Sequence, residues 1–575
     1  MLKLFKHFKT NKILLVSLFI IILMKTIGIL YIPTLTAKII NNGVIKGDIY
    51  YVLKTGGIMI IVAIFTGVLA ILSTYLSANL SGSLSRDIRS KMFSHAQKLS
   101  IHDFKHFSTS SLITRCTSDV NQIENIVTMF FEMIIPVPFI TIVGMFFAFS
   151  KDSYMAFIIF ITGVIFIVFN ILISKKVISL SLKIQVQLDK INSRVRQYIS
   201  GIRIIRAFNR EKHEKELMDD TFTDYANINI EMNKILGVAM PGVMAIMNVC
   251  AVAILWFGSM RVSKGTMLIG DIMAVIEYSI IIFVFLVMAI IVLLSVPRAS
   301  ACSRRILEVL EYEPEIVDEK TTEFISSGKK TLEFRNVTFS YMDAEKPVLK
   351  NLNFICESGK TTAIIGATGS GKSTIGKLIP RLHEIQGGEI LINGVNIKDF
   401  SQKSLRDIVG FSPQKAFLFS GTISDNIKHG KKDATIDEIK SASKAAQADE
   451  FISELNHGYD SFVSQGGSNF SGGQRQRLCI ARTLVKKSDI YVFDDSFSAL
   501  DYKTDAKLRK AIKPRLKDAI VITIAQRIST IMEADQIIVL EEGTIVGIGT
   551  HRELLKNCPI YMQIAESQLS KEELA

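Results

Sequence analysis

The hydrophobic residues of this chain are unevenly distributed along its 575 positions. Before about residue 300 they form long blocks, whereas after about residue 330 they form runs no longer than single strands or helices. A block of about 21 residues makes a helix of about 31 Å, which is long enough to cross a bilayer. The first block is too long for the core of a signal peptide, and no small-residue cleavage site follows it. The pattern predicts six membrane-spanning helices, near residues 13–33, 56–78, 126–149, 153–174, 237–259 and 268–296.

Two long polar stretches, residues 79–125 and 175–236, lie between these blocks. In the first stretch, apolar residues recur at threes and fours from Phe104 to Ile123, as they do on one face of a helix. The connections to the neighbouring blocks are too short for a separate cytosolic subdomain. We therefore expect residues 1–310 to form an all-α, six-helix membrane domain whose helices continue into the cytoplasm.

The position of the basic residues predicts the orientation of these helices. The chain has a net charge of +13, and the Lys and Arg residues of its membrane half gather before the first span and in the two polar stretches. The alternate loops are short and hold few basic residues. Because Lys and Arg are retained on the cytoplasmic side, both termini and both polar stretches are predicted to be cytoplasmic in a multi-pass protein of the cell membrane. The basic surplus is thus a topology signal, and we expect no nucleic-acid binding.

The charged residues Lys25, Glu132 and Glu277 lie well inside predicted spans, away from the span ends. A charge within the bilayer is costly, so each is a candidate functional residue. Lys25 has a simpler explanation, in which its side chain extends to the interface or pairs with a neighbouring helix. Glu277 lies midway in an apolar run and is the preferred candidate for a substrate pathway, with Glu132 as the second.

The second half of the chain has the pattern of a soluble domain. Residues 311–330 are charged, contain Pro and Gly and show no periodicity, as is typical of a linker. From residue 331 to residue 575, short apolar runs predict strands and helices, beginning with strand, turn and strand over Leu332–Phe334 and Val337–Tyr341. The six cysteines are scattered without a Cys-x-x-Cys pair, so neither a disulfide framework nor a zinc site is predicted.

A glycine-rich stretch follows the apolar run Thr362–Ile365 and precedes a helix-like run from Ile375. In this context the spacing Gly-x-x-x-x-Gly-Lys-Ser is typical of a phosphate-binding loop, whose backbone N–H groups converge on an anion. We expect Lys372 to reach the β- and γ-phosphates and the Ser373 hydroxyl to ligate Mg²⁺. The loop consists of Gly366, Ala367, Thr368, Gly369, Ser370, Gly371, Lys372, Ser373 and Thr374.

Two further positions fit the chemistry of a nucleotide. The apolar run Ile490–Phe493 ends in Asp494 and Asp495, and a buried parallel strand delivers an acid to Mg²⁺ in this way. A helix cap would also explain Asp494, but two acids at the end of one strand favour the metal site. Tyr341 lies upstream of the loop and carries an aromatic ring that can stack on adenine. ATP and Mg²⁺ are therefore the predicted ligands.

Residues around this loop resemble the ATPase of ABC transporters. Residues 470–478, Phe-Ser-Gly-Gly-Gln-Arg-Gln-Arg-Leu, resemble the signature motif of that family, and residues 498–501 resemble its D-loop. Gln414 resembles the Q-loop glutamine, which contacts the metal, and Tyr341 resembles the adenine-stacking tyrosine. Upstream, stretches near residues 101–110 and 201–213 resemble the coupling loops of six-helix exporters. All of these occur in the order of the family, so the resemblance covers nearly the whole chain.

The resemblance implies a working unit of two membrane halves and two α/β P-loop ATPase halves, of which this chain supplies one each. ATP would be held between the phosphate loop of one subunit and the signature residues of the other, which here are Ser471, Gly472, Gly473 and Gln474. Binding of ATP would close the pair and turn the membrane cavity outward, and hydrolysis would reset it.

Two residues depart from the pattern of the family. Asp495 stands where the general base is a Glu, and a shorter side chain places the carboxylate about an ångström from the required position, which can cost about a hundredfold in rate. Gln526 stands where the switch loop has a His, and an amide has no titratable proton. Gln465, before the signature, is a weaker third departure. Drift without consequence is the alternative, but both main departures fall in one nucleotide site while the signature is intact.

These departures predict a heterodimer. A homodimer would place Asp495 and Gln526 in both ATP sites, whereas a partner with Glu and His at the matching positions would supply one competent site. The partner is also expected to carry a less faithful signature. The site of this chain is expected to turn over slowly and to act mainly as a regulator.

The cargo is less defined by the sequence. Drug-like amphiphilic small molecules are the first expectation, followed by lipids or peptides. The first span begins about a dozen residues after Met1, so no leader-cleaving peptidase is expected ahead of it, which argues against a dedicated bacteriocin exporter. A soluble ABC ATPase is excluded by the six spans, and an importer usually has its membrane part on a separate chain. A nucleotide-gated sensor that moves no substrate is the remaining alternative.

Overall fold

The computed structural model describes residues 3, 12–318, 330–342 and 344–569. The chain forms two compact units, of which the first contains Met1–Gln97 and Ser108–Tyr312 and the second contains Lys98–Phe107 and Glu313–Ala575. The first is called the membrane unit below and the second the ATPase unit. Of the expected linker, residues 319–329 lie outside the described residues.

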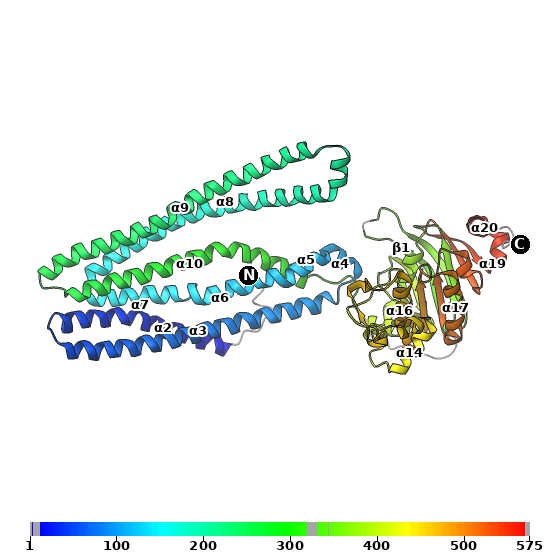
Figure 1. Ribbon diagram of the computed structural model, residues 1–575, viewed down its shortest axis with the longest axis horizontal. Coiled ribbons are helices and arrows are strands. Elements are labelled where there is room, and N and C mark those ends of the chain that lie inside the picture. The colour runs from blue at the N-terminus through cyan, green and yellow to red at the C-terminus, as the bar shows by residue number, and fades with distance from the viewer. Residues whose placement is uncertain (1–2, 4–11, 319–329, 343, 570–575) are drawn as a thin grey trace. The chain divides into compact units, whose positions relative to one another are not determined.

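The membrane unit is entirely helical in its described residues, and several of its helices are much longer than a bilayer is thick (Figure 1). Three short π-helical turns, η1 (Ile39–Val44), η2 (Arg115–Asp119) and η3 (Phe130–Ile134), interrupt or extend them. The α-helices are α2 (Lys12–Lys38), α3 (Ile49–Ala96), α5 (Thr109–Thr114), α6 (Val120–Met129), α7 (Pro136–Lys151), α8 (Ser153–Ala207), α9 (Glu211–Ser263) and α10 (Ile269–Leu310).

Within the described residues, six helical segments are long and apolar enough to cross a membrane, and they confirm the six expected spans. The segments are Lys12–Val44, Ile49–Ala96, Thr109–Lys151, Ser153–Ala207, Glu211–Ser263 and Ile269–Leu310. α8 has 55 residues, or about 80 Å at 1.5 Å per residue, so it extends well beyond a hydrocarbon core of about 30 Å. The predicted helical extensions are therefore present.

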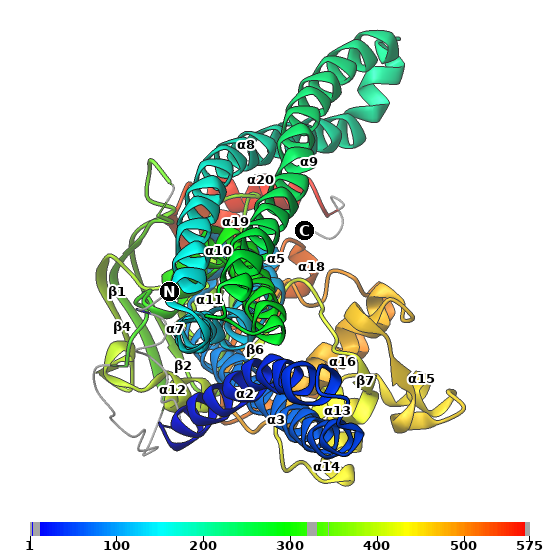
Figure 2. The same ribbon diagram turned by 90° about the vertical axis from the view of Figure 1, so that its left-hand side faces the viewer.

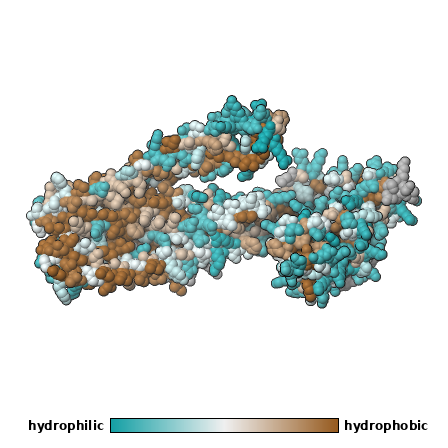
Figure 3. Space-filling model, viewed as in Figure 1, coloured by the Kyte–Doolittle hydropathy of each residue, from teal (hydrophilic) through white to brown (hydrophobic). Residues whose placement is uncertain are grey.

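The helices of the membrane unit pack in a defined pattern. α8 and α9 lie side by side (Figures 1 and 2), and α10 packs against α2, α6, α7 and α9. Close approach depends on small residues, since a Cβ at Gly144 would lie 2.9 Å from Ile282. A buried Tyr278 hydroxyl is 2.6 Å from the hydroxyl of Thr34 and joins α10 to α2. Figure 3 shows apolar residues gathered over the spanning parts of this unit and hydrophilic ones at the far ends of α8 and α9.

In its described residues, the ATPase unit contains three sheets and a set of shorter helices. Its strands are β1 (Thr331–Phe339), β2 (Leu349–Glu357), β3 (Thr361–Gly366), β4 (Gly387–Ile392), β5 (Val395–Asn396), β6 (Val409–Ser412), β7 (Gly421–Thr422), β8 (Phe462–Val463), β9 (Ile490–Asp494), β10 (Ile520–Ile524), β11 (Gln536–Glu541) and β12 (Thr544–Gly549). Its α-helices are α4 (Ile101–Phe107), α11 (Lys372–Leu378), α12 (Gln402–Ile408), α13 (Ile423–Lys428), α14 (Ile436–Ala445), α15 (Asp449–Ser453), α16 (Gly472–Val485), α17 (Tyr502–Ile512), α18 (Ile528–Ile531), α19 (His551–Asn557) and α20 (Pro559–Glu566).

The main sheet has the order β12-β11-β3-β10-β9-β6, and all of its strands except β12 run parallel. Every residue of β9 and β10 is buried, as expected for parallel strands covered on both faces. The register pairs Ile524 with both Ile364 and Asp494. The carboxyl ends of β3, β10 and β9 therefore meet at one edge of the sheet. This confirms an α/β P-loop domain after an all-α membrane domain.

One expectation about the start of this unit is wrong. Instead of strand, turn and strand, residues 331–339 form the single strand β1, which pairs with β2 on one side and β4 on the other. The register shifts after Phe334 on the β2 side. Asn336 there has a φ of 49°, so the polar pair Arg335–Asn336 forms a bulge rather than a turn.

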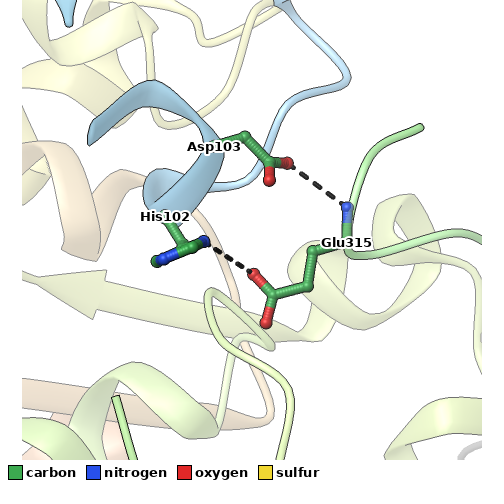
Figure 4. A group of neighbouring side chains, drawn as sticks. All are labelled: His102, Asp103 and Glu315. Carbon is green, nitrogen blue, oxygen red and sulfur yellow. Dashed lines mark hydrogen bonds and ion pairs between the residues drawn. The ribbon is translucent and has the colours of Figure 1, made fainter. Parts of the chain in front are cut away.

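Residues 98–107 come from between two membrane helices but pack with the ATPase unit. Ser100 and Asp103 cap α4 reciprocally, since each side chain accepts the backbone N–H of the other at 3.1 and 2.8 Å. Figure 4 shows Glu315 beside this cap, with its N–H donating to Asp103 at 3.3 Å and its carboxylate 3.8 Å from His102 Nδ1. The hydroxyl of Ser100 also donates to Glu315 at 3.1 Å. These bonds attach α4 to the residues that follow α10.

The membrane unit contains an ion pair whose acidic member is buried. Arg305 donates to the two carboxylate oxygens of Asp119 at 2.8 and 2.5 Å, and the Asp119 side chain is 3% exposed. We predict that Arg305→Ala lowers the free energy of unfolding by about 1–3 kcal/mol, because it leaves a buried carboxylate unpaired. Thermal unfolding of the purified protein in detergent measures the loss. Arg304 is the exposed neighbour, and Arg304→Ala is the control. If Arg305→Ala caused an equal loss of free energy of unfolding in a protein that already carries Asp119→Asn, the pairing would be contradicted.

Candidate functional site

The glycine-rich loop lies in the middle of the main sheet. It follows β3, which is flanked by β11 and β10, so the loop emerges where neighbouring strands end together. Gly366 leaves no room for a side chain, since a Cβ there would lie 2.1 Å from the carbonyl oxygen of Leu540. Gly371 has a φ of 98°, which a residue with a Cβ rarely adopts. The sequence thus folds here into a tight cradle immediately after a buried strand.

Polar groups in this loop are poised for an anion. The Lys372 ammonium donates to the carbonyl oxygens of Gly366 and Ala367 at 2.8 and 2.7 Å. Burial lowers the pKa of Lys372, and the charges of Asp495 and Asp494 raise it in part. The Ser370 hydroxyl is buried without a hydrogen-bond partner among the described residues. A phosphate in the cradle would accept from both groups, so the residues present fit a nucleotide.

Asp494 and Ser373 form a second part of the site. Asp494 ends β9 and is 1% exposed, and its carboxylate accepts a hydrogen bond of 2.7 Å from the Ser373 hydroxyl. Burial raises the pKa of Asp494 above its ordinary value, while Ser373 and the charge of Lys377 lower it. A hydroxyl and a buried carboxylate at hydrogen-bond distance are oxygen donors of the kind that Mg²⁺ prefers. The pair therefore fits the predicted metal.

Asp495 is held by two amides. Its carboxylate oxygen Oδ2 accepts from Gln526 Nε2 at 3.1 Å and from Gln414 Nε2 at 3.4 Å. Its own backbone has a φ of 48°, and its N–H donates to the carbonyl of Ile524 at 2.9 Å. Burial raises the pKa of Asp495, and hydrogen bonds to Ser498 and Gln414 lower it. The structure thus brings together both residues that depart from the pattern of the family and Gln414, the Q-loop residue, which follows β6.

Tyr341 lies at the edge of the same region. Its hydroxyl is 3.1 Å from the Thr374 hydroxyl, and its ring meets that of His383 edge-on, with centroids 5.4 Å apart. Burial and the charges of Lys377, Lys105 and His102 lower the pKa of His383 to about 4, so this imidazole is neutral at pH 7. The Lys105 ammonium of α4 lies 5.8 Å from the centre of the Tyr341 ring. The ring therefore has a basic neighbour that sequence reasoning did not find.

The signature residues lie elsewhere in the ATPase unit. Ser471 caps α16, and its side chain and that of Gln474 each accept a backbone N–H of the other, at 3.3 and 2.9 Å. Ser471 and Gly472 are exposed, and α16 packs against α13, α14 and β6. Among the described residues, no hydrogen bond joins this end of α16 to the glycine-rich loop. A single chain therefore presents the two motifs at separate places.

The two intramembrane acids, Glu132 and Glu277, belong to the membrane unit. Glu132 is in η3, has a buried oxygen without a hydrogen-bond partner among the described residues, and is close enough to act electrostatically on Lys25. Glu277 is half-buried on α10 and makes no hydrogen bond or ion pair within the described part of the chain. Their roles in a substrate pathway stay predictions.

One cluster outside the nucleotide site has the composition of a metal centre. Ligand atoms of His102, Asp103 and Glu315 lie within 4.8 Å of one another (Figure 4). The capping and ion-pair contacts described above already engage all three. The structural role in holding α4 accounts for this cluster without a bound ion.

Only a part of the geometry of this site could be predicted from the sequence. The strand–loop–helix context indicated Lys372 and Ser373, and the apolar run before Asp494 indicated that residue, because each of these two patterns is local. The convergence of Gln414 and Gln526 on Asp495 depends on the order β10-β9-β6 in the sheet. The contact of Lys105 with Tyr341 joins residues 236 positions apart, and no periodicity in the sequence indicates it.

The fold and the site together define a membrane-spanning P-loop ATPase, in which nucleotide chemistry and six spans share one chain. Residues 14–287 match the family described as ABC transporter transmembrane region, and residues 349–498 match the family described as ABC transporter. The chain belongs to the ABC transporter family and has the architecture of an exporter, with ATP hydrolysis coupled to transport.

Several relatives cover nearly the whole chain. An uncharacterized ABC transporter ATP-binding protein of Mycobacterium tuberculosis is 36% identical over 567 residues, which cover 98% of this chain and 97% of the relative. The ABC transporter ATP-binding protein YfiB of Bacillus subtilis is 37% identical over 540 residues, or 94% of each chain. An ATP-dependent lipid A-core flippase of Syntrophus aciditrophicus is 30% identical over 488 residues, covering 85% of this chain and 81% of the flippase.

A solved structure supports the fold. The structure of a bacterial Atm1-family ABC exporter with ATP bound superimposes with a TM-score of 0.81 and covers 97% of this chain and 98% of its own. The two sequences are 23% identical, so the likeness concerns the fold alone.

The position of Lys372 leads to a prediction about nucleotide binding. Lys372→Ala removes the buried ammonium of the cradle and should weaken ATP binding at this site at least tenfold, because charge-assisted bonds to phosphate are among the stronger hydrogen bonds. Photolabelling with an azido-ATP analogue measures the occupancy. Lys360→Ala is the matched control, since Lys360 is an exposed lysine at the start of β3 that pairs with Glu357. Unchanged labelling in Lys372→Ala would contradict the assignment.

Proposed function

We propose that this chain exports amphiphilic small molecules across the cell membrane, as one half of a heterodimeric ABC exporter whose partner carries the faster ATP site. The observation that carries the proposal is the pair of amide hydrogen bonds on Asp495, from Gln526 at 3.1 Å and from Gln414 at 3.4 Å. A general base must accept a proton from the attacking water with a correctly placed oxygen. Here the short carboxylate is held by two groups that donate N–H and exchange no proton.

The remaining residues of the site support nucleotide binding. Lys372 and the backbone of the glycine-rich loop would hold the β- and γ-phosphates, and Tyr341 would stack on the base. Ser373, Asp494 and Gln414 would hold Mg²⁺, which when bound neutralises charge on the phosphates. The side chains of this chain thus bind and orient ATP, while the placement of Asp495 limits its hydrolysis. The expected result is a site that retains ATP for longer than a competent site does.

The separation of the two motifs supports a dimer. The signature residues Ser471, Gly472, Gly473 and Gln474, of which the first two are exposed, share no hydrogen bond with the glycine-rich loop of their own chain in its described part. We propose that they complete the ATP site of the partner, while the partner's signature completes the site built around Lys372. Two identical chains would then have Asp495 in both sites, so a different partner chain with Glu and His at these positions is required for rapid turnover.

Residues 98–107 are the proposed route from nucleotide to membrane. They join two long helices of the membrane unit and yet pack with the ATPase unit, where α4 is bonded to Glu315 and Lys105 lies near Tyr341. A change at the nucleotide that moves this segment would pass along the chain to the helices that it joins. The proposed second coupling loop, near residues 201–213, contains the end of α8, the turn at residues 208–210 and the start of α9. The arrangement also supports a cytoplasmic position for both loops and for the ATPase unit.

Lipid export is the second candidate for the cargo. Relatives of this chain include ATP-dependent lipid A-core flippases from three bacteria. Both cargoes are amphiphiles. An uptake assay with vesicles distinguishes them when small amphiphiles and lipids are offered separately. We expect ATP-dependent uptake of small fluorescent amphiphiles by the reconstituted heterodimer. Nucleotide binding without movement of any amphiphile or lipid would instead favour a nucleotide-gated sensor.

The asymmetry of the two ATP sites has a direct test. In the purified heterodimer, replacing the general-base Glu of the partner by Gln should reduce ATPase activity at least a hundredfold, whereas Asp495→Asn should reduce it less than threefold. Asp495→Glu combined with Gln526→His should raise turnover at this chain's site, because it restores both the reach of the carboxylate and a titratable imidazole. Full substrate-stimulated activity from this chain purified alone would contradict the heterodimer.

The attachment of α4 gives a prediction about coupling. Glu315→Ala removes the hydrogen bond from the Ser100 hydroxyl and the charge contact with His102, and it should lower substrate stimulation of ATPase activity severalfold, while photolabelling by azido-ATP stays unchanged. Glu313→Ala is the control, because Glu313 is exposed and has no hydrogen bond or ion pair in the described part of the chain. Equal stimulation in both variants would show that these contacts do not transmit the signal.

A further inference from the structure

The membrane unit contains a cavity that neither the nucleotide site nor the intramembrane acids explain. Its volume is about 530 Å³, within the range of about 300–1,000 Å³ that is typical of small-molecule sites. It lies between η3 and the start of α7, the middle of α8, and α10. Its lining consists of Ile134, Val137, Pro138, Phe166, Ile167, Asn170, Ile171, Ser174, Lys175, Ile178, Leu286, Ala289, Ile290, Leu293 and Leu294.

The polar groups of the cavity are confined to one helix. α7 and α10 contribute only apolar side chains, whereas α8 contributes Asn170, Ser174 and Lys175. The lining of α8 runs from Phe166 to Ile178, or about 18 Å along the helix axis. The cavity is therefore elongated and has apolar walls throughout, with Asn170 in the first half of this stretch and Ser174 and Lys175 in the second half. This division suits a molecule with an apolar body and a polar head.

Lys175 determines the charge of that head. It is the one charged residue in the lining, and it makes no hydrogen bond or ion pair within the described residues. Neither Glu132 nor Glu277 lines the cavity. Since an unpaired ammonium next to an apolar cavity favours an anion, a ligand with a carboxylate or phosphate head fits better than a cation.

The position of Lys175 along the chain agrees with this assignment. The apolar block of α8 ends at Ser174, and the polar stretch begins at Lys175. A lysine at such a boundary lies at the level of the lipid headgroups, with the apolar lining on the bilayer side. An amphiphile that enters from the cytoplasmic leaflet would keep its usual orientation in this cavity, with its chain among Leu286, Ile290 and Leu293 and its head at Lys175.

We propose that this cavity binds an acidic amphiphile, through an ion pair between its anionic head and Lys175 and burial of its apolar chain against α7 and α10. The proposal rests on the proposed export function and specifies its substrate class. It concerns binding in the membrane unit, so it can be tested without turnover.

The test uses the full heterodimer in nanodiscs of uncharged lipid, at pH 8 and low salt. The probes are three diazirine-bearing hexadecyl compounds that differ only in their heads: a carboxylic acid, a primary alcohol and a primary amine. We expect the acid to label peptides from residues 166–178 and 286–294 about tenfold more strongly than the alcohol, and the amine less than either. In Lys175→Gln the preference for the acid over the alcohol should disappear, and in Lys175→Glu the amine should be preferred.

Lys176→Gln is the matched control, because Lys176 is the exposed next residue and does not line the cavity. It should keep the preference for the acid. The proposal would be overturned by an unchanged preference in Lys175→Gln, by an equal loss in Lys176→Gln, or by labelling of other helices. It would also be overturned if cysteines introduced at Leu286 or Ile290 cross-linked to the partner subunit and no probe labelled the cavity.

The outcome is separable from that of the proposed function. Labelling by the acid with the expected loss in Lys175→Gln, but no ATP-dependent uptake of any amphiphile into vesicles, would reject export and retain the binding site. If vesicles took up amphiphiles in an ATP-dependent manner but the diazirine probes showed no preference for the acid, the export function would be retained and this binding site would be rejected. Leu293→Trp, which fills the apolar part of the cavity, should reduce labelling by all three probes.

Discussion

The parallel register of four strands is the constraint on which the nucleotide chemistry depends. Ile524 pairs with Ile364 and with Asp494, and Ser412 pairs with Phe493, so four strands end at the same edge of the sheet. The glycine-rich loop follows β3, and Asp494 and Asp495 lie at the end of β9. Gln526 follows β10, and Gln414 follows β6. Because the strands are buried on both faces, this register is fixed by packing, and a ligand at the edge can be held by residues far apart in sequence.

The same constraint brings the two residues that depart from the pattern of the family into contact. Asp495 follows β9 and Gln526 follows β10, the strand next to it, so their side chains meet at 3.1 Å. A Gln at this position satisfies the carboxylate as a donor but cannot take part in proton transfer. Restoring only one of the two residues would leave either a short carboxylate or an amide without a titratable proton. The pair is therefore consistent with a site adapted to hold ATP rather than with isolated drift.

How much the sequence reveals depends on the range of the contacts. Local patterns predicted the six spans, β3 with its loop, and β9 with Asp494, since each is defined by residues close together in the chain. The bulge at Asn336 was missed because pairing to two neighbouring strands outweighs the turn preference of Asn. The bonds from Glu315 to α4 and the place of Lys175 beside α10 depend on tertiary packing, and the sequence has no local signal for either.

The function of an exporter requires that ATP binding in one half of the chain change the conformation of the membrane helices in the other half. ATP binding can bias the membrane helices only by the difference in its affinity for the two conformations. The proposed slow site around Asp495 would keep that bias in place for longer than a fast site does. Release of the proposed cargo would require separation of its head from Lys175 and withdrawal of its chain from α10, and a sustained bias gives more time for both steps. In this proposal, retention of ATP and retention of an amphiphile match each other.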